Sequence, residues 1–316
     1  MAKIAVELER AVSERAARGW AAQNPIPRVF AQGAGWRVAD LICTSGPQDR
    51  PFEEQHSQVS IAIVLAGTFQ YRTPDSSRTG ELMTPGSLLL GNPGQCFECD
   101  HRHGTGDRCL SFSYAPEYFA LVASHAGSAT GRRPFPTPRL PLLRALSPLI
   151  SEIVIAQMEA QPAREQGGAT NLTLALAWEE FAIQLAASAL QLADSARRCL
   201  ADALPSTMAR VTRAVRTIEN QADSDLTIAR LAREAGLSPY HFLRSFAQLT
   251  GVTPHQYLLR ARLREAATRL ATQTASVLEI ALDCGFGDVS NFNRAFRKEF
   301  GTHPRGFRRR GLAASG

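Results

Sequence analysis

The sequence predicts an α+β chain of several domains, in which a β-rich N-terminal domain precedes a central helical segment and an all-α C-terminal domain. Its 316 residues correspond to two or three domains of roughly 100–200 residues each. Short β-rich runs dominate the first third of the chain, and helical periodicity with turn residues dominates everything after Pro205. We therefore place the domains at 1–135, 136–204 and 205–312.

The N-terminal domain is expected to combine a short helix with a set of strands. Residues 1–22 have the pattern of an amphipathic helix. Gly, Pro, Asp and Ser separate the β-rich runs that follow. These runs are Val38–Cys43, Val59–Leu65, Thr68–Arg72, Ser87–Leu90 and Arg108–Tyr114. Several short strands at this spacing are typical of a β-barrel or a β-sandwich.

The central segment is expected to contain two helices, at about Leu140–Glu159 and Thr170–Ala196. Apolar residues recur in the second stretch at near-helical spacing and form a stripe, which includes Leu172, Leu176, Phe181, Leu185 and Leu192. Such a stripe either packs on its own domain or joins two copies of the chain. The pattern alone does not choose between these alternatives.

The charge of the chain is concentrated at its C-terminal end. Residues 208–316 contain 17 Lys and Arg against 9 Asp and Glu, whereas residues 1–207 contain 18 against 20. Nearly all the cations are Arg, whose planar fork suits phosphates and guanine edges. A basic C-terminal third on a near-neutral remainder indicates a module that binds a polyanion, although a merely basic surface would give the same count.

The segment 226–246 has the pattern of two short helices joined by a tight turn. Gly236 can take a positive φ after the first helix, and Ser238 can cap the start of the second. Phe242 and Phe246 lie four residues apart, so one face of the second helix can pack against the first. The apolar residues of the first helix are Ile228, Leu231, Ala232 and Ala235. This is the pattern of a helix-turn-helix unit.

The same pattern recurs about fifty residues later, in the segment 277–296. Gly285 occupies the turn, Asp288 the cap, and Phe292 and Phe296 the apolar face of the second helix. The first helix contributes Ile280, Ala281 and Cys284 to the interface between the two. The alternative is a helical bundle that does not bind nucleic acid. Two units of this kind argue strongly against it.

A long helix is expected between the two units. The segment Thr250–Tyr257 has the residues that cap and start a helix, and the helical pattern continues to about Ala271. About 18 residues at roughly 1.5 Å each span about 27 Å. That length is close to one turn of a DNA duplex, about 34 Å, so the second helices of both units could enter successive major-groove segments.

The two units, the connecting helix and the segment 285–307 together resemble the AraC/XylS DNA-binding domain over about Met208–Arg310. The resemblance implies a homeodomain-like, double helix-turn-helix regulator that binds double-stranded promoter DNA, with RNA polymerase as a second partner if it activates transcription. It also implies that base-facing positions are occupied by Tyr240, Leu243, Arg244, Ser290, Asn291, Asn293 and Arg294. Leu243 departs from the polar residue often found at its position.

The N-terminal part resembles the cupin-like barrel that often precedes this DNA-binding domain. The resemblance rests on Thr84–Gly91, on the turn Val64–Gly67 and on the general architecture. It implies that a small molecule enters the barrel and changes how the DNA-binding domain is presented. The expected partners are therefore a small-molecule or metal effector and a second copy of the chain.

Five residues with sulfur or imidazole ligands fall within fourteen positions: Cys96, Cys99, His101, His103 and Cys109. Such a set suits zinc or another thiophilic metal ion. Cys96 and Cys99 converge only if the chain turns at Glu98–Asp100, whereas His101 and His103 share a face if the segment is a strand. Two alternatives are a redox-sensing thiolate and thiols that only pack as small hydrophobic side chains.

An enzyme is the rival class, namely a cupin-type metalloenzyme fused to a helical domain. The sequence shows neither a phosphate loop nor a nucleophile elbow, and His101-Arg-His103 lacks a clear downstream ligand set. We therefore expect a regulator rather than an enzyme. No apolar run reaches the length of a membrane helix and no signal peptide is evident, so we expect a cytoplasmic protein with reduced cysteines.

Overall fold

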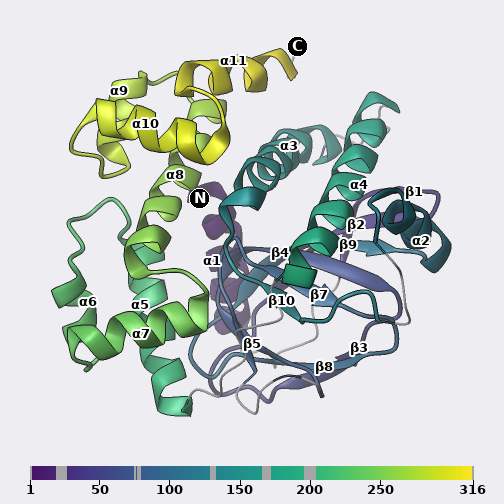
Figure 1. Cartoon of the computed structure of the whole chain (residues 1–316), viewed down its shortest axis with the longest axis horizontal. Helices are drawn as coiled ribbons and strands as arrows, with labels where there is room; N and C mark the ends of the chain where they lie inside the picture. Colours follow the sequence, from purple (N-terminus) through teal and green to yellow (C-terminus); the bar gives the residue numbers. More distant parts are fainter. Residues whose placement is uncertain are drawn as a thin grey trace.

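Two antiparallel sheets pack against each other in the N-terminal half of the chain (Figure 1). The first sheet has the strand order β1-β2-β9-β4-β7-β10 and the second has the order β3-β8-β5-β6. The strands are β1 (Arg28–Gly33), β2 (Trp36–Cys43), β3 (Phe52–Gln55), β4 (Val59–Gly67), β5 (Phe69–Arg72), β6 (Glu81–Met83), β7 (Leu88–Gly91), β8 (Cys96–Asp100), β9 (Asp107–Tyr114) and β10 (Arg139–Leu140). We call this two-sheet unit and the helices packed on it the β-domain.

The computed structural model describes residues 2–18, 27–74, 76, 80–128, 133–165, 172–195 and 204–314. Its helices are α1 (Ala2–Arg18), α2 (Pro116–His125), a 3-10 turn at Arg144–Leu146, α3 (Ser147–Glu165), α4 (Leu172–Ser195), α5 (Pro205–Asn220), α6 (Ile228–Glu234), α7 (Pro239–Thr250), α8 (Pro254–Thr272), α9 (Val277–Asp283), α10 (Val289–Phe300) and α11 (Pro304–Ala314). Within this part of the chain, no helix combines the length and apolar character needed to cross a bilayer.

Strand β9 shows how the first sheet separates two interiors. Successive side chains of a strand point to opposite faces. Phe112 and Tyr114 belong to the core that also contains Trp178 of α4, and the Tyr114 hydroxyl donates a hydrogen bond to the Ala182 carbonyl at 2.9 Å. Cys109 instead faces the second sheet, in a smaller cluster with side chains of β4, β5, β6, β7 and β8. Of the stripe predicted on α4, Leu185 is fully buried in this core and Phe181 and Leu192 pack against it, whereas Leu176 is exposed.

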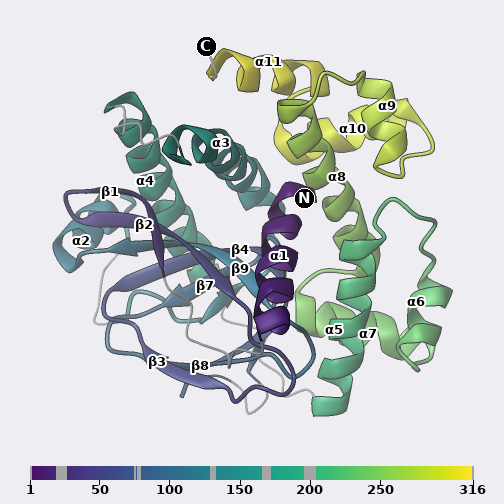
Figure 2. The same cartoon turned by 180° about the vertical axis from the view of Figure 1, so that it is seen from behind.

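Helix α1 lies against β2 and β4, at the back of Figure 1 and at the front of Figure 2. One buried ion cluster connects it to the sheet. The Arg108 guanidinium of β9 bonds Asp40 of β2 at 2.7 Å and Glu7 of α1 at 2.7 Å. Arg108 is almost fully buried, so its charge needs a carboxylate partner, and Asp40 of the same sheet supplies one. Glu7 is a second, more exposed partner, and its ion pair with Arg108 attaches α1 to the sheet.

The helical C-terminal domain contains two hydrophobic cores, one for each unit. The helices of the two units lie one above the other in Figure 1, with α8 between them. Helices α5, α6 and α7 surround the first, which contains the fully buried Phe242 and Phe246. Helices α9, α10 and α11 surround the second, which contains the fully buried Phe292 and Phe296. Helix α8 contributes to both cores. These aromatic residues were predicted to pack in this way, and the α+β class with an all-helical C-terminal domain is confirmed.

The expected strands are all present, but five further strands were not predicted: β1, β3, β6, β8 and β10. Strand β10 pairs with β7 through Leu140 and Leu88, so the first sheet extends beyond the expected boundary at residue 135. Because Leu140 belongs to this strand, α3 begins only at Ser147 and not at Leu140, where the helix was expected to start. The end of the expected helix 1–22 lies outside the described residues after Arg18.

Candidate nucleic-acid interface

Capping residues fix the start of each helix in the first unit. The Thr227 side chain accepts a hydrogen bond from the Arg230 amide at the start of α6, and Ser238 accepts one from the His241 amide at the start of α7. Gly236, between the two helices, has a φ of +62°, which glycine adopts without a Cβ penalty. The turn and cap predicted from the sequence are therefore present.

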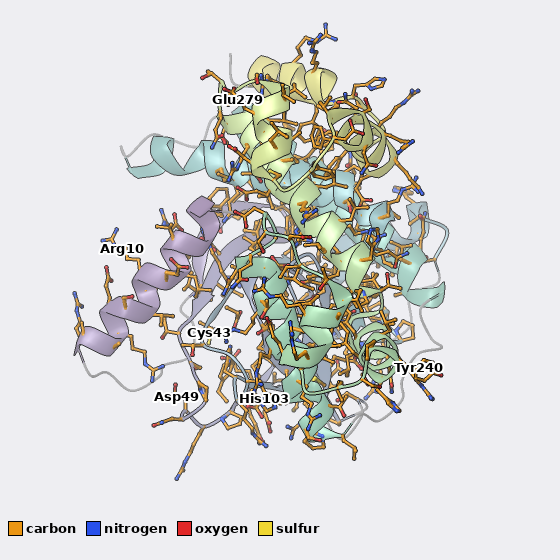
Figure 3. All side chains as sticks on the ribbon, turned by 90° about the vertical axis from the view of Figure 1, so that its left-hand side faces the viewer. Arg10, Cys43, Asp49, His103, Tyr240 and Glu279 are labelled. Atoms are coloured by element: carbon orange, nitrogen blue, oxygen red, sulfur yellow. The ribbon has the colours of Figure 1, made fainter. Side chains whose placement is uncertain are left out.

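The exposed face of α7 carries the three side chains of the first unit that were predicted to face DNA bases. Two large hydrophobic side chains are exposed on this face: Tyr240 is 69% exposed and Leu243 is 40% exposed. Arg244 is exposed beside them. Figure 3 shows Tyr240 projecting from the edge of the helical domain. Solvent exposure of such side chains on a well-packed helix is typical of a recognition surface.

The second unit has the same local construction with stronger caps. Ser276 and Glu279 form a capping box at the start of α9, and the Asp288 carboxylate accepts hydrogen bonds from the Ser290 and Asn291 amides, both at 2.9 Å. These two bonds lower the pKa of Asp288. Gly285 has a φ of +81°, and a Cβ there would lie only 2.7 Å from the Asp223 carbonyl oxygen. Only glycine fits this turn.

The exposed face of α10 is polar. Ser290, Asn291 and Arg294 are exposed and Asn293 is half-buried. The Arg294 guanidinium donates a hydrogen bond to the Asn291 side-chain oxygen at 3.3 Å, so these two side chains lie next to each other on the helix. Amide and guanidinium groups in such an arrangement can bond base edges in a major groove. Arg297 and Lys298 are exposed one turn further along the helix.

Helix α8 holds the two units at a fixed separation. Thr253 and Gln256 form a capping box at its start, and its 19 residues correspond to about 28 Å. Near its middle, the Arg262 guanidinium donates hydrogen bonds to the Ala222 and Ser224 carbonyls, at 2.6 and 2.9 Å. Near its end, Arg269 pairs with Asp283 of the second unit at 3.2 Å. Both units are therefore attached to one continuous helix.

The segment 139–147 of the β-domain contacts both units. Arg139 donates hydrogen bonds to the carbonyls of Leu249 and Thr250 at 3.0 and 2.6 Å, at the C-terminal end of α7. Ser147 donates one to Glu299 of α10 at 2.5 Å. The same segment accepts a hydrogen bond at the Leu142 carbonyl from Arg260 of α8 at 2.7 Å. We call this segment the joint between the two domains.

The five residues predicted to bind a metal do not form one site. Strand β8 continues through Glu98–Asp100, where a turn was required, so Cys96 is exposed and Cys99 is buried. His101 and His103 do not share a face either, because the strand ends at Asp100. His101 is buried and bonds Asp107, whereas the His103 carbonyl accepts a hydrogen bond from Arg216 of α5 at 3.5 Å. The prediction of a five-residue site is therefore wrong.

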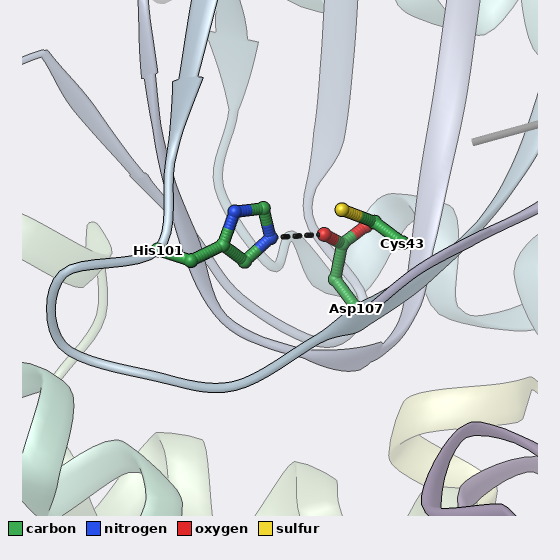
Figure 4. Close-up of side chains that lie close together, drawn as sticks. All are labelled: Cys43, His101 and Asp107. Carbon is green, nitrogen blue, oxygen red and sulfur yellow. Dashed lines mark hydrogen bonds and ion pairs between the residues drawn. The ribbon is translucent and has the colours of Figure 1, made fainter. Parts of the chain in front are cut away.

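The structure instead brings His101 together with two residues outside the predicted set, Cys43 and Asp107 (Figure 4). Their candidate ligand atoms lie within 4.8 Å of one another. The His101 Nε2 and Asp107 Oδ1 atoms are 2.6 Å apart. Burial alone would lower the pKa of His101, but the hydrogen bonds with Asp107 and Cys43 outweigh it and raise this pKa to about 10. Cys109, a predicted ligand, donates its S–H to Asp107 at 3.3 Å.

The sequence of the two helix-turn-helix units is similar to that of known proteins. Residues 231–310 match the family described as a helix-turn-helix domain. The HTH-type transcriptional activator RhaS of Klebsiella pneumoniae (strain 342) is 31% identical over 271 residues, which cover 83% of this chain and 89% of the relative. This chain belongs to the AraC/XylS family of transcriptional regulators. The family predicted from the sequence is thus confirmed, and with it a regulator that binds DNA.

Two further comparisons concern the C-terminal part of this AraC/XylS regulator. The probable transcription factor PqrA of Proteus vulgaris is 37% identical over 91 residues, which cover 29% of this chain and 75% of the relative. A solved structure of a transcriptional regulator from Chromobacterium violaceum, described as containing an AraC-type DNA-binding domain, is 29% identical, with a TM-score of 0.32. The match covers 34% of this chain and 96% of the chain in that structure.

Proposed function

We propose that a single chain of this AraC/XylS regulator binds two successive major-groove segments on one face of promoter DNA, through α7 and α10. One observation carries the proposal. Both helices bury a pair of Phe side chains and expose side chains that can contact base edges, and both belong to units that share the continuous helix α8. The length of α8 matches the distance between successive major-groove segments to within about two base steps.

The side chains suit different base edges. Asn291 and Asn293 can donate and accept at adenine, and Arg244 and Arg294 can donate to the two acceptors of guanine. Tyr240 and Leu243 offer apolar contact, for which the thymine methyl group is the partner in a major groove. Ser290 can bond either purine. The second unit therefore carries more of the base discrimination, and the first unit contributes shape and apolar contact.

Footprinting of the full-length protein tests this proposal. A promoter fragment selected by the protein itself from random duplexes is treated with hydroxyl radicals and with a reagent for guanine N7. We expect two protected guanine-containing segments whose centres lie about 10–10.5 base pairs apart on one face. Protection of one segment only, or of two segments on opposite faces, would show that the two units do not bind together.

We propose that the β-domain receives a signal and that the joint transmits it to both units. The supporting observation is that Arg139 and Ser147 reach α7 and α10, respectively. The Klebsiella relative is named a transcriptional activator, so we propose activation, with RNA polymerase as the second partner. We propose a small-molecule or metal effector because the β-domain resembles the cupin-like barrel in which such an effector binds.

We also propose that the regulator acts as a homodimer and by binding rather than catalysis. Leu176 and Ile183 of α4 are 59% and 42% exposed and lie seven residues apart, two turns along one face, which suits a helix–helix contact. The separation of His101 from His103 argues against a cupin-type metalloenzyme, because its paired histidines would have to face one site. Since promoter DNA is the partner, the proposed compartment is the cytoplasm.

A further inference from the structure

We propose that the β-domain binds a thiophilic divalent metal ion, of which Zn²⁺ is the representative, through Cys43, His101 and Asp107. These residues come from three separate segments: the end of β2, the turn after β8 and the start of β9. Figure 4 shows their side chains pointing toward one another. This ligand set differs from the one suggested by the sequence and shares only His101 with it.

Sheet register brings two of the three ligands together. Cys43 and Asp107 are directly opposite each other in the antiparallel pair β2–β9, so their side chains leave the same face of the sheet. His101 approaches from the second sheet, at the beginning of the turn 101–106. Two backbone hydrogen bonds hold this turn, from the Gly104 amide to the His101 carbonyl and from the Gly106 amide to the Ser45 carbonyl. The site is therefore built by regular elements on both sides.

The donor atoms fit a tetrahedral ion after a small movement. Two ligands on such an ion lie roughly 3.3–3.6 Å apart when the metal–nitrogen, metal–oxygen and metal–sulfur distances are about 2.0–2.3 Å. The three candidate atoms already lie within 4.8 Å of one another. The contact between His101 Nε2 and Asp107 Oδ1, now 2.6 Å, would have to widen by about 1 Å to admit the ion. The ion would take the place of the proton in this contact and of the Cys43 thiol proton, and both protons would be released to solvent.

The surroundings favour a soft or borderline metal over Ca²⁺ or Mg²⁺. Cys43, His101 and Asp107 are 3%, 4% and 6% exposed, so water has little access to them. Cys109 donates its S–H to the second oxygen of Asp107 at 3.3 Å and so helps to hold this carboxylate in place. The neighbouring Phe69 ring is stacked on His101 with centroids 5.8 Å apart. Sulfur and imidazole donors in a dry apolar site select zinc-like ions over hard cations.

The site is connected to the DNA-binding domain by a short path. The turn that begins with His101 continues to His103, whose carbonyl accepts a hydrogen bond from Arg216 of α5. Gly104 packs so closely under Arg216 that a Cβ there would lie 2.8 Å from the guanidinium. Widening of the contact between His101 and Asp107 therefore moves the turn against α5. This coupling, unlike metal binding itself, rests on the proposed function.

Cobalt binding by the full-length protein tests the site directly. Co²⁺ is titrated into metal-free protein, and absorption is recorded for the d–d bands of tetrahedral Co²⁺ and for thiolate-to-metal charge transfer. We expect one equivalent per chain, with displacement by Zn²⁺. Cys43→Ser and His101→Gln should abolish charge transfer or lower affinity by at least about 100-fold. The matched control, Cys96→Ser, removes an exposed thiol of the same domain and should bind as the native protein does.

A second measurement uses the native sequence only, in case either variant fails to fold. Because Cys43 is buried, its alkylation is followed over time in sub-denaturing urea, where transient opening exposes the thiol. Peptide mass spectrometry should show that Zn²⁺ slows alkylation of Cys43 but not that of the exposed Cys96. Absence of charge transfer, or a signal that is lost in Cys96→Ser but kept in Cys43→Ser, would overturn the site. Alkylation of Cys43 at the same rate with and without Zn²⁺ in sub-denaturing urea would overturn it as well.

Amide exchange measured without DNA separates the site from its coupling. Zn²⁺ should change exchange in the turn 101–106 and in α5 around Arg216 in the native protein, but not in Cys43→Ser. Normal Co²⁺ binding with unchanged exchange in α5 would refute the coupling and leave the metal site standing. Normal Co²⁺ binding by a protein that does not prefer any DNA sequence would instead refute the proposed function.

Discussion

At the scale of single residues, Asn291 and Arg294 of α10 concentrate the base-reading chemistry of the molecule. Their side chains lie 3.3 Å apart, and both are exposed. We predict that Asn291→Ala and Arg294→Ala each reduce the discrimination between the selected sequence and a scrambled one by about 1–3 kcal/mol. Fluorescence anisotropy with both duplexes at one salt concentration measures this difference.

The control for these two variants is Arg37→Ala, which removes an exposed Arg of β2 in the β-domain, away from α7 and α10. It should leave the ratio of the two affinities unchanged. The interpretation of α10 fails if Arg294→Ala weakens binding to both duplexes equally, because Arg294 would then contact phosphate rather than a base.

Also at this scale, the buried Phe side chains determine whether each unit folds. Phe292 is fully buried and contacts the rings of Phe286 and Phe296, with centroids 5.0 and 5.5 Å apart. We predict that Phe292→Ala lowers the free energy of unfolding by about 3–5 kcal/mol, because it removes buried area and leaves a cavity. Chemical denaturation followed by circular dichroism measures the change.

Leu278→Ala provides the comparison for Phe292→Ala. Leu278 belongs to the same unit but is 51% exposed on α9, so its truncation should change stability by no more than about 0.5 kcal/mol. Similar destabilisation by both variants would mean that the second unit does not have the packed core described above.

At the scale of elements, the C-terminal end of α7 depends on a residue from the other domain. Carbonyls at a helix end have no partner within the helix, and the Arg139 guanidinium satisfies those of Leu249 and Thr250. We predict that Arg139→Met costs about 1–3 kcal/mol, since two buried carbonyls no longer have a donor and Glu81 keeps a buried charge. Faster amide exchange around residues 246–252 should accompany the destabilisation.

The double variant Arg139→Met with Glu81→Gln isolates the two contributions. It should recover part of the stability, because the uncompensated carboxylate is gone, but it should not slow the exchange in α7. Unchanged exchange in the single variant would show that the joint does not hold this helix.

Several elements could be predicted because their determinants are local. Gly236, Gly285 and the caps Ser238 and Asp288 act within a few residues, so the sequence alone places both units. Strand β8 could not be predicted in this way. Its residues Cys96–Asp100 show no β-branched side chain, and its extended conformation depends on pairing with β3 and β5.

The candidate metal site shows the same limit for side chains. Cys43 and Asp107 are 64 residues apart, and only the register of β2 and β9 makes them neighbours. Local spacing emphasised Cys96, which the strand turns to solvent. A signal was nevertheless present, since Cys43 ends one expected strand and Asp107 immediately precedes another.

At the scale of the whole molecule, positive charge on the helix that contacts DNA bases should make DNA binding strongly dependent on salt. Arg297 and Lys298 lie on α10 beyond the base-reading side chains. We predict that replacing both by Ala makes the plot of log affinity against log salt shallower by about 1 for each phosphate that is no longer neutralised. Preference for the selected sequence should change little, because bonds to phosphates carry no sequence information.

Titrations at several salt concentrations with the selected duplex measure this slope. A slope equal to that of the native protein would mean that these two cations face solvent in the complex. A loss of sequence preference without a change in slope would reassign them to the bases.

The continuous helix α8 has a further consequence for the DNA that this regulator can use. Duplex DNA rotates by a full turn every 10–10.5 base pairs. Because α8 fixes the two units on one side of the molecule, inserting about five base pairs between their target segments would turn one segment to the opposite face of the duplex. A rigid chain cannot follow that rotation, so helical phase, as much as base sequence, should define which promoters it recognises.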